Sequence, residues 1–322
     1  MNSPLLVVLR KELGDALRSR LVLLLVAGLG AVVILSVIVA ASAFHAKVAD
    51  YQHYLRALQQ AGGTAPTAPL FFPLQLLRGA VEYLEIIGAI VAIVIGYGMI
   101  AKEKNRGTLR LLFSRPVSGY AVAGGKLLAM VVIWLVVTVG VGVVMIVAIR
   151  LVGGTGLSGV ELLKLGITLG LAWLYLFMWS ALAMGLAGYT KQLSTALVIG
   201  LIVWLGFVLI IPQIGDTMDP DNQAPGGLFK SLQVDKPHEK TVMAKFAGYE
   251  TTRNRLEEAS ISKHFERTSF AYLGVKDKYN QASLGVIGSA MWTNFVWLFG
   301  GGVLATVLAL TQTSKRKLLR RT

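Results

Sequence analysis

Six long apolar runs recur along this chain, and they constrain its fold more than any other feature of the sequence. The first, Leu21–Phe44, and the last, Ser283–Leu310, carry no charged residue. A helix needs about 20 mostly apolar residues to cross a bilayer, and it satisfies its own backbone hydrogen bonds there. The runs between them are Ala80–Ala101, Leu127–Ile149, Leu165–Ala187 and Leu193–Ile211. The sequence therefore predicts an all-α, polytopic membrane protein with six transmembrane helices.

The charges indicate how these spans are oriented. Six spans place both termini on one side, together with the loops after the second and fourth spans. That side holds 16 of the 31 Lys and Arg residues but only three of the 17 Asp and Glu residues. The positive-inside rule makes it cytoplasmic. We therefore expect a multi-pass protein of the plasma (inner) membrane with cytoplasmic termini. Basic flanks beside anionic lipid explain the net charge of +14 without nucleic acid.

The chain ends are predicted to lie at the cytoplasmic surface. Residues 1–20 read as an interfacial helix, with Ser3 as N-cap and Pro4 at the first helical position. Its leucines recur every fourth residue: Leu5, Leu9, Leu13 and Leu17. Lys11, Glu12 and Asp15 fall elsewhere on the helix, so an amphipathic helix on the membrane surface is expected. A solvated leader is the alternative. Residues 312–322 form a basic cytoplasmic tail.

Two segments are assigned to the other side of the membrane. Residues 47–79 contain GGTAPTAP and read as an irregular loop. Residues 212–282 begin as a loop and then become rich in helix formers, so a helical extracytoplasmic segment is predicted before the last span, residues 283–311. Its apolar residues form a loose stripe: Val242, Phe246, Tyr249, Leu256 and Phe265. We expect this stripe to be buried against protein or lipid headgroups.

Between the second and third runs, within residues 21–211, the chain turns polar and basic over AKEKNRGTLRLLFSRPVSGY. Three of its apolar side chains share one helical face, at i, i+3 and i+4: Leu109, Leu112 and Phe113. The residue before Pro116 is pushed out of the helical region, so the helix must end there, and Ser118 can cap the next helix. A short amphipathic helix at about 103–114 is predicted. On spacing alone, a connector that rests on lipid fits equally well.

Two stretches resemble permease subunits of the ABC type-2 exporter family. KELGDALRSR resembles the segment before their first span, and EKNRGTLRLLFSRPVSGYAVAGGK resembles their cytoplasmic loop after the second. The closest branch is the six-span permeases grouped with the nitrous-oxide-reductase maturation exporter. The positions that match the loop pattern are Glu103, Gly107, Thr108, Leu109, Leu111, Leu112, Ser114, Pro116, Gly125 and Lys126.

The resemblance implies a coupling helix that sits in a groove on a separate ATP-binding cassette subunit. Leu112 and Phe113 would be its apolar knob, and Arg106 and Arg110 the polar rim. The expected contact residues are Glu103, Arg106, Gly107, Thr108, Leu109, Arg110, Leu112, Phe113 and Pro116. The chain has no phosphate-binding loop of its own, because GYAVAGGKLL departs from the pattern G-x-x-x-x-G-K-[ST]. We therefore expect no cofactor on this chain, with ATP and magnesium bound by the partner.

A second candidate site lies at the outer end of the second span. Glu82 and Glu85 lie three residues apart there, and Arg78 lies one turn before Glu82. They form either an interfacial ion-pair cluster or a polar outer gate. The four histidines lie outside the spans or at their outer edge and read as surface residues, not metal ligands: His45, His53, His238 and His264. No arrangement of catalytic residues stands out, so no enzyme is predicted.

These features favour an ABC exporter permease that works as a homodimer with two ATPase subunits, the pairing being implied by the resemblance. The segment before the last span is then expected to cap the outer mouth of the dimer and to gate release or dock an extracytoplasmic partner. Two alternatives stay open. One is a mechanotransmitting or signalling subunit driven by the same ATPase. The other is an ion-coupled carrier, which the scarcity of charged residues within the spans disfavours.

Overall fold

The computed structural model describes residues 3–61, 72–108, 118–153, 156–218 and 247–313, together with residues 238, 241, 244 and 245. Within these residues the chain is helical and contains no strand. Six helical stretches are long and apolar enough to cross a membrane: Arg20–Leu58, Pro73–Asn105, Gly119–Leu151, Gly159–Tyr189, Leu193–Gly215 and Trp292–Gln312. The prediction of an all-α polytopic membrane protein with six spans is confirmed.

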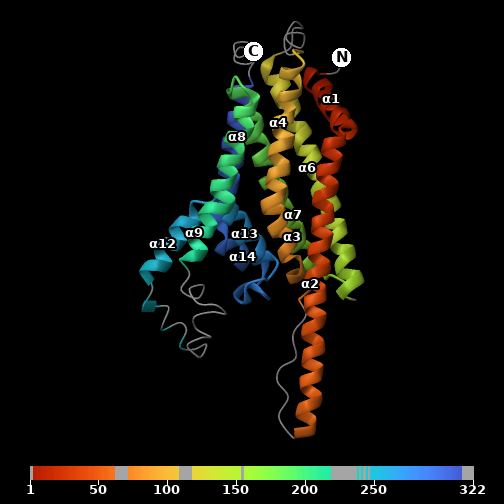
Figure 1. Cartoon of the computed structure of the whole chain (residues 1–322), viewed down its shortest axis with the longest axis vertical. Helices are drawn as coiled ribbons and strands as arrows, with labels where there is room; N and C mark the ends of the chain where they lie inside the picture. Colours follow the sequence, from red (N-terminus) through yellow and green to blue (C-terminus); the bar gives the residue numbers. More distant parts are fainter. Residues whose placement is uncertain are drawn as a thin grey trace.

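The N-terminal helix α1 (Pro4–Arg18) begins as its sequence predicts. The Ser3 hydroxyl accepts the backbone N–H of Leu6 at 3.4 Å, and Pro4 occupies the first turn. After a break at Ser19, helix α2 (Arg20–Ala61) continues far beyond Phe44 and extends past the other helices at the end away from α1 (Figure 1). The prediction of an irregular loop from residue 47 was therefore wrong as far as Ala61.

The second and fifth spans each contain a π-helical segment. The second span comprises η1 (Pro73–Leu77), α3 (Arg78–Tyr83), η2 (Leu84–Gly88) and α4 (Ala89–Asn105). The fifth comprises α8 (Leu193–Trp204), η3 (Leu205–Ile210) and α9 (Ile211–Thr217). A wider helical turn changes the backbone hydrogen bonding and leaves carbonyl oxygens for side chains. The Tyr175 hydroxyl donates to the Glu85 carbonyl at 3.0 Å, and the Ser262 hydroxyl donates to the Phe207 carbonyl at 2.9 Å.

The core lies around α7 (Gly159–Tyr189), which packs against α4, α6 (Gly119–Gly153) and α15 (Trp292–Gln312). Helices α4 and α7 approach at backbone distance, because a Cβ atom at Gly96 would lie 2.0 Å from the carbonyl oxygen of Ser180. The Ser180 hydroxyl donates to the Ala92 carbonyl at 2.9 Å and accepts the indole N–H of Trp134 at 2.7 Å. One buried hydroxyl thus joins three spans.

The segment before the last span enters the bundle instead of covering it. It contains α12 (Ala247–Glu258), α13 (Ile261–Tyr272), η5 (Asp277–Tyr279) and α14 (Leu284–Ala290). Phe265 of α13 is fully buried and stacks on Tyr175 of α7 with ring centroids 4.6 Å apart. Leu256 is half-buried, whereas the side chains of Val242, Phe246 and Tyr249 lie outside the described residues. Helix α13, which we expected to belong to a cap over the bundle, is therefore part of the core.

The last apolar run is not one continuous helix. It divides at Met291 into α14 and α15, and the Met291 backbone leaves the helical region between them. The prediction of a single span over Ser283–Leu310 was wrong in this respect, although α15 alone is long enough to cross the bilayer.

Candidate functional site

The loop that resembles a coupling helix leaves the bundle between α4 and α6. Figure 1 shows the C-terminal end of α4 beside α1, at the end away from the extension of α2. We call this end the loop end and the other the distal end. The predicted helix at about 103–114 begins inside α4, since Glu103 lies in the last turn of that helix.

Helix α4 ends in a Schellman motif, which explains the glycine of the Gly-Thr-Leu sequence. Gly107 has φ +65°, a left-handed conformation that costs a residue with a side chain about 1–2 kcal/mol. The N–H of Thr108 donates to the Glu103 carbonyl at 3.1 Å, and the N–H of Gly107 donates to the Lys104 carbonyl at 3.1 Å. The chain therefore turns at Gly107, and one helix cannot run from residue 103 to residue 114.

The other predicted contact residues divide into two groups. Arg106 is exposed and Thr108 is half-buried at the loop end. The remaining five lie outside the described residues, so their contact role stays a prediction: Leu109, Arg110, Leu112, Phe113 and Pro116. On the far side of the loop, Ser118 accepts the backbone N–H of Ala121 at 3.1 Å, and the predicted cap of the next helix is confirmed.

A buried cluster of four charges lies at the base of this loop. The Lys126 ammonium of α6 donates to Glu12 Oε1 of α1 at 2.6 Å, to Glu103 Oε1 of α4 at 3.0 Å and to the Met99 carbonyl at 2.8 Å. Lys11 also reaches Glu103 Oε1, at 2.6 Å, and Glu12 Oε1, at 3.2 Å. We call these four side chains, Lys11, Glu12, Glu103 and Lys126, the charge clamp. It ties α1 to the helices on both sides of the loop.

The clamp is neutral as a whole and almost dry at its centre. The side chains of Lys126 and Glu12 are each 1% exposed and that of Glu103 is 8% exposed, whereas Lys11 is 46% exposed. Burial alone would raise the pKa of Glu12, but Lys126 and then Lys11 outweigh it and hold that pKa below its ordinary value. Burial likewise opposes the charge of Lys11, but Glu103 and Glu12 raise its pKa. Both groups are therefore ionised at neutral pH.

Helix α1 lies close enough to α6 for Glu12 to reach Lys126. A Cβ atom at Gly125 would lie 2.7 Å from Val8 Cβ and 2.9 Å from the Leu5 carbonyl, so only glycine fits without a shift. The buried face of α1 is Val8, Glu12 and Ala16. Glu12 was predicted to lie away from the apolar face of α1. Glu12 does lie away from the leucine stripe, but the face that carries it is the buried one, and Lys126 supplies its partner there.

Lys104, next to the clamp, joins α4 to the end of α7. Its ammonium donates to the carbonyls of Ala187 at 2.9 Å and Thr190 at 2.8 Å. The last carbonyls of a helix have no intrahelical partner, and a cation there also favours the helix dipole. The residue that follows Glu103 therefore links the end of α4 to the end of α7.

The second candidate site is divided by the structure. Arg78 donates to Glu82 at 2.9 Å; Arg78 is exposed and Glu82 is half-buried. Glu85 is buried, with 5% of its surface exposed, beside α13. Its polar neighbours there are Ser262, Lys263 and Glu266, and Glu82 of its own span also acts on it electrostatically. The three residues do not form one exposed cluster, and whether they gate a pathway stays a prediction.

One of the four histidines, His264, is not the surface residue that the sequence predicted. His45, His53 and His238 are exposed, but His264 is 2% exposed and lies between α12 and α15. Within the described part of the chain, no group of three or more His, Asp and Glu side chains could hold a metal ion.

The charge clamp was not predicted, although its signals were present in the sequence. Glu12 lies four residues after Val8 and four before Ala16, and Glu103 and Lys126 are the two charged positions of the loop pattern. Their mutual contact required the fold, because Lys126 and Glu12 lie 114 residues apart.

Six helices that are long and apolar enough to cross a membrane are the architecture of a multi-pass membrane protein. Residues 6–318, nearly the whole chain, match the family described as ABC-2 family transporter protein. The chain belongs to this family and is an ABC transporter permease. No curated protein is found to match it.

Proposed function

We propose that this chain is the membrane-spanning permease of an ATP-driven exporter of the plasma membrane, paired as a homodimer with two copies of a separate ATP-binding cassette subunit. ATP and magnesium would be held by that partner, and no cofactor by this chain. We assign it to the six-span branch that includes the nitrous-oxide-reductase maturation permease, on the loop pattern from Glu103 to Lys126. Both termini and the loop end face the cytoplasm in this proposal, on the charge asymmetry.

The observation that carries the coupling proposal is the charge clamp. The loop follows the end of α4 at Asn105 and leads into α6 at Gly119. Glu103 in the last turn of α4 and Lys126 in the second turn of α6 join these two helices close to the loop. Glu12 adds α1 to the same contact. A displacement applied to the loop would therefore move α1, α4 and α6 together, and Lys104 would pass it to α7. This arrangement suits a loop that receives force from a soluble partner.

The test is a substitution in the loop with a matched control at the same end of the bundle. Leu112→Asp would place a carboxylate where the partner's pocket must desolvate it, and uncompensated burial costs several kcal/mol. Leu17→Asp makes the same change on α1, where Leu17 is 73% exposed. Each variant is co-expressed with the candidate ATP-binding subunit, and complex recovery and ATP hydrolysis in proteoliposomes are measured.

We expect Leu112→Asp to abolish recovery of the complex or stimulation of ATP hydrolysis, and Leu17→Asp to retain both. Equal recovery and equal hydrolysis for the two variants would contradict the coupling proposal. Transport across the same proteoliposomes separates the alternatives. ATP hydrolysis that depends on this chain but moves no solute would assign it to mechanotransmission.

A further inference from the structure

Two adjoining cavities lie where α12 and α13 meet the spans, toward the distal end. An apolar groove of about 570 Å³ runs between α7, the fifth span, α13 and α15. A polar pocket of about 410 Å³ lies beside it, bounded by α12, α13 and the start of α15. Glu258, His264 and Trp297 line both. Each volume falls within the about 300–1,000 Å³ usual for small-ligand sites.

The groove follows the middle of α15 and is about as long as half the hydrocarbon core is thick. Along α15 it extends from Trp297 to Leu308, a distance of about 16 Å at the rise of an α-helix. Half of the hydrocarbon core is about 15 Å. Leu304 on its wall is 72% exposed, so the groove opens sideways toward the space that lipid would fill. Its other walls include Met178, Val203 and Phe207.

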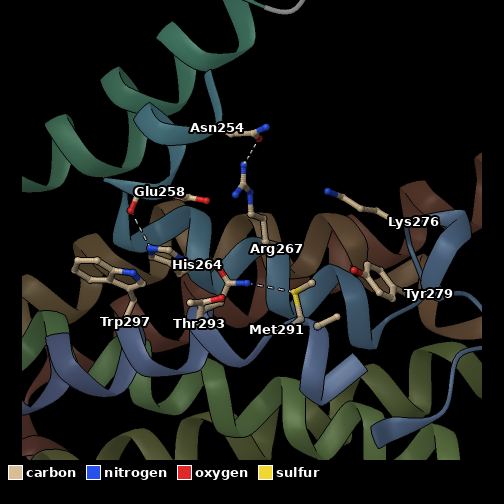
Figure 2. Close-up of a pocket in the computed structure, with 11 residues that line it drawn as sticks. Asn254, Glu258, His264, Arg267, Lys276, Tyr279, Met291, Thr293 and Trp297 are labelled. Carbon is tan, nitrogen blue, oxygen red and sulfur yellow. Dashed lines mark hydrogen bonds between the residues drawn. The ribbon is translucent and has the colours of Figure 1, made fainter. Parts of the chain in front are cut away.

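A fixed aromatic pair forms the boundary between the groove and the polar pocket. The rings of His264 and Trp297 stack with centroids 5.6 Å apart and planes inclined by 7°. Asn294 Oδ1 lies 2.6 Å from His264 Nδ1, and the Glu258 carbonyl lies 2.9 Å from His264 Nε2. Figure 2 shows this pair at one side of the pocket and Arg267 and Lys276 across from it. A ligand that occupies both cavities would pass this boundary from an apolar to a polar region.

The polar region carries an excess of positive charge. A third cavity of about 310 Å³ shares Arg267 and Lys276 with the polar pocket. Together the two polar cavities are lined by five cations, Arg78, Arg253, Lys263, Arg267 and Lys276, and by three acids, Glu257, Glu258 and Glu266. Four of the cations pair with carboxylates: Arg78 with Glu82, Arg253 and Arg267 with Glu257, and Lys263 with Glu266. Lys276 is exposed as a residue, but partial desolvation of its ammonium by the surrounding protein, and next the nearby Arg267, lower its pKa. Among the side chains that the structure describes, Lys276 has no salt-bridge partner within 4.0 Å.

We propose that the groove and the polar pocket together bind one membrane lipid with an anionic headgroup, whose headgroup faces the distal end. Its acyl chain lies along α15 from Trp297 toward Leu308, and its headgroup contacts Lys276 and Arg267. Charge complementarity and the length of the groove identify this occupant. The proposal is independent of the coupling proposal, because it concerns binding at the other end of the molecule and needs no ATPase.

The chain offers separate variants for the two halves of the site. No atom lies within 4 Å of a Cβ atom placed at Gly300, so Gly300→Leu fills the groove without a clash at the backbone. Gly140→Leu is its control, because Gly140 is equally open on α6 and lines neither cavity. Lys276→Gln removes the headgroup charge, and Lys276→Arg restores it. Lys47→Gln is the control on the exposed extension of α2.

The experiment is native mass spectrometry of the full chain, extracted from vesicles of equal parts phosphatidylglycerol and phosphatidylcholine. We expect one retained phosphatidylglycerol per chain. Gly300→Leu should lose it, and Lys276→Gln should weaken its retention about tenfold, the effect of one charge-assisted contact. Lys276→Arg, Gly140→Leu and Lys47→Gln should retain it. Lys276 is exposed, so its variants test the site even if Gly300→Leu does not fold.

Three results would overturn the proposal. The first is equal retention of the two lipids by the unaltered chain. The second is a loss in Gly140→Leu and Lys47→Gln as large as that in the site variants. The third concerns a second copy of the chain as occupant. The sequence has no cysteine, so Gly300→Cys can be treated in membranes with a short bis-maleimide. Efficient cross-linking of two copies through this residue would show that protein covers the groove.

Discussion

Replacing Lys126 by methionine should destabilise the protein far more than the same change at Lys11. The Lys126 ammonium is 1% exposed and donates three hydrogen bonds, to Glu12, Glu103 and the Met99 carbonyl. Its removal leaves two carboxylates buried with one partly exposed cation. Breaking a buried pair in this way costs about 3–5 kcal/mol. Lys11 is 46% exposed, and an exposed pair contributes about 0–1 kcal/mol. We therefore expect a difference of at least about 2 kcal/mol between the two variants.

The two variants can be compared by reversible unfolding of the purified protein in detergent, with proteolysis of α1 as a second readout. Lys126→Met should expose α1 to protease, because Glu12 on its buried face loses its partner. The double variant Glu12→Gln, Lys126→Met removes one of the stranded carboxylates and should recover part of the lost stability. If Lys126→Met and Lys11→Met unfold within about 0.5 kcal/mol of each other, the clamp does not hold α1 to the bundle.

Three further predictions concern the orientation of the chain and the structure of the loop end. Cysteine at Asn105 should be protected from an impermeant thiol reagent in intact cells and cysteine at Asn222 labelled, and the reverse pattern would contradict the orientation. Gly107→Val should lower stability by about 1–2 kcal/mol, because a β-branched residue is strained at φ +65°, and an unchanged unfolding midpoint would contradict this. Glu12 has a lowered pKa, so its contribution is complete above its ordinary value of about 4.3 and is lost as the pH falls through the lower, folded value. Unfolding of Glu12→Gln should therefore depend less on pH in this range than that of the unaltered chain.

The spans could be predicted because their signal is local. An uncharged apolar run of bilayer length has one stable conformation in lipid, whatever its neighbours are. The caps at Ser3 and Ser118 were predictable for the same reason, since they bind backbone groups three residues away. The extension of α2 to Ala61 was missed because the loss of hydrophobicity was interpreted as the end of the helix. Its sequence, AKVADYQHYLRALQQA, is rich in helix formers that favour a helix outside the bilayer too.

The burial of charged and polar side chains could not be predicted from local pattern. Glu12 on an amphipathic helix is ordinarily exposed, and only Lys126, 114 residues away, reverses this. Helix α13 is another case, because ISKHFERTSFAY mixes charges with aromatics and is typical of a surface helix. The Ser262 hydroxyl of α13 donates to the Phe207 carbonyl, which lies in the π-helical part of the fifth span. The sequence of α13 alone does not show that a π-helical turn in another span will accept its hydroxyl groups.

The same packing that hides α13 offers a physical connection between the two ends of the molecule. Lys104 fixes the end of α4 to the end of α7, and Ser180 holds the two helices together at mid-span, where Gly96 lets their backbones touch. Further along α7, Tyr175 stacks on Phe265 of α13 and donates to the Glu85 carbonyl in the π-helical part of the second span. Helices in backbone contact cannot slide past each other without breaking these bonds. A movement of α4 at the loop end must therefore either carry α7 and α13 with it or disrupt the Ser180 contact. Moving the three helices together breaks fewer buried hydrogen bonds.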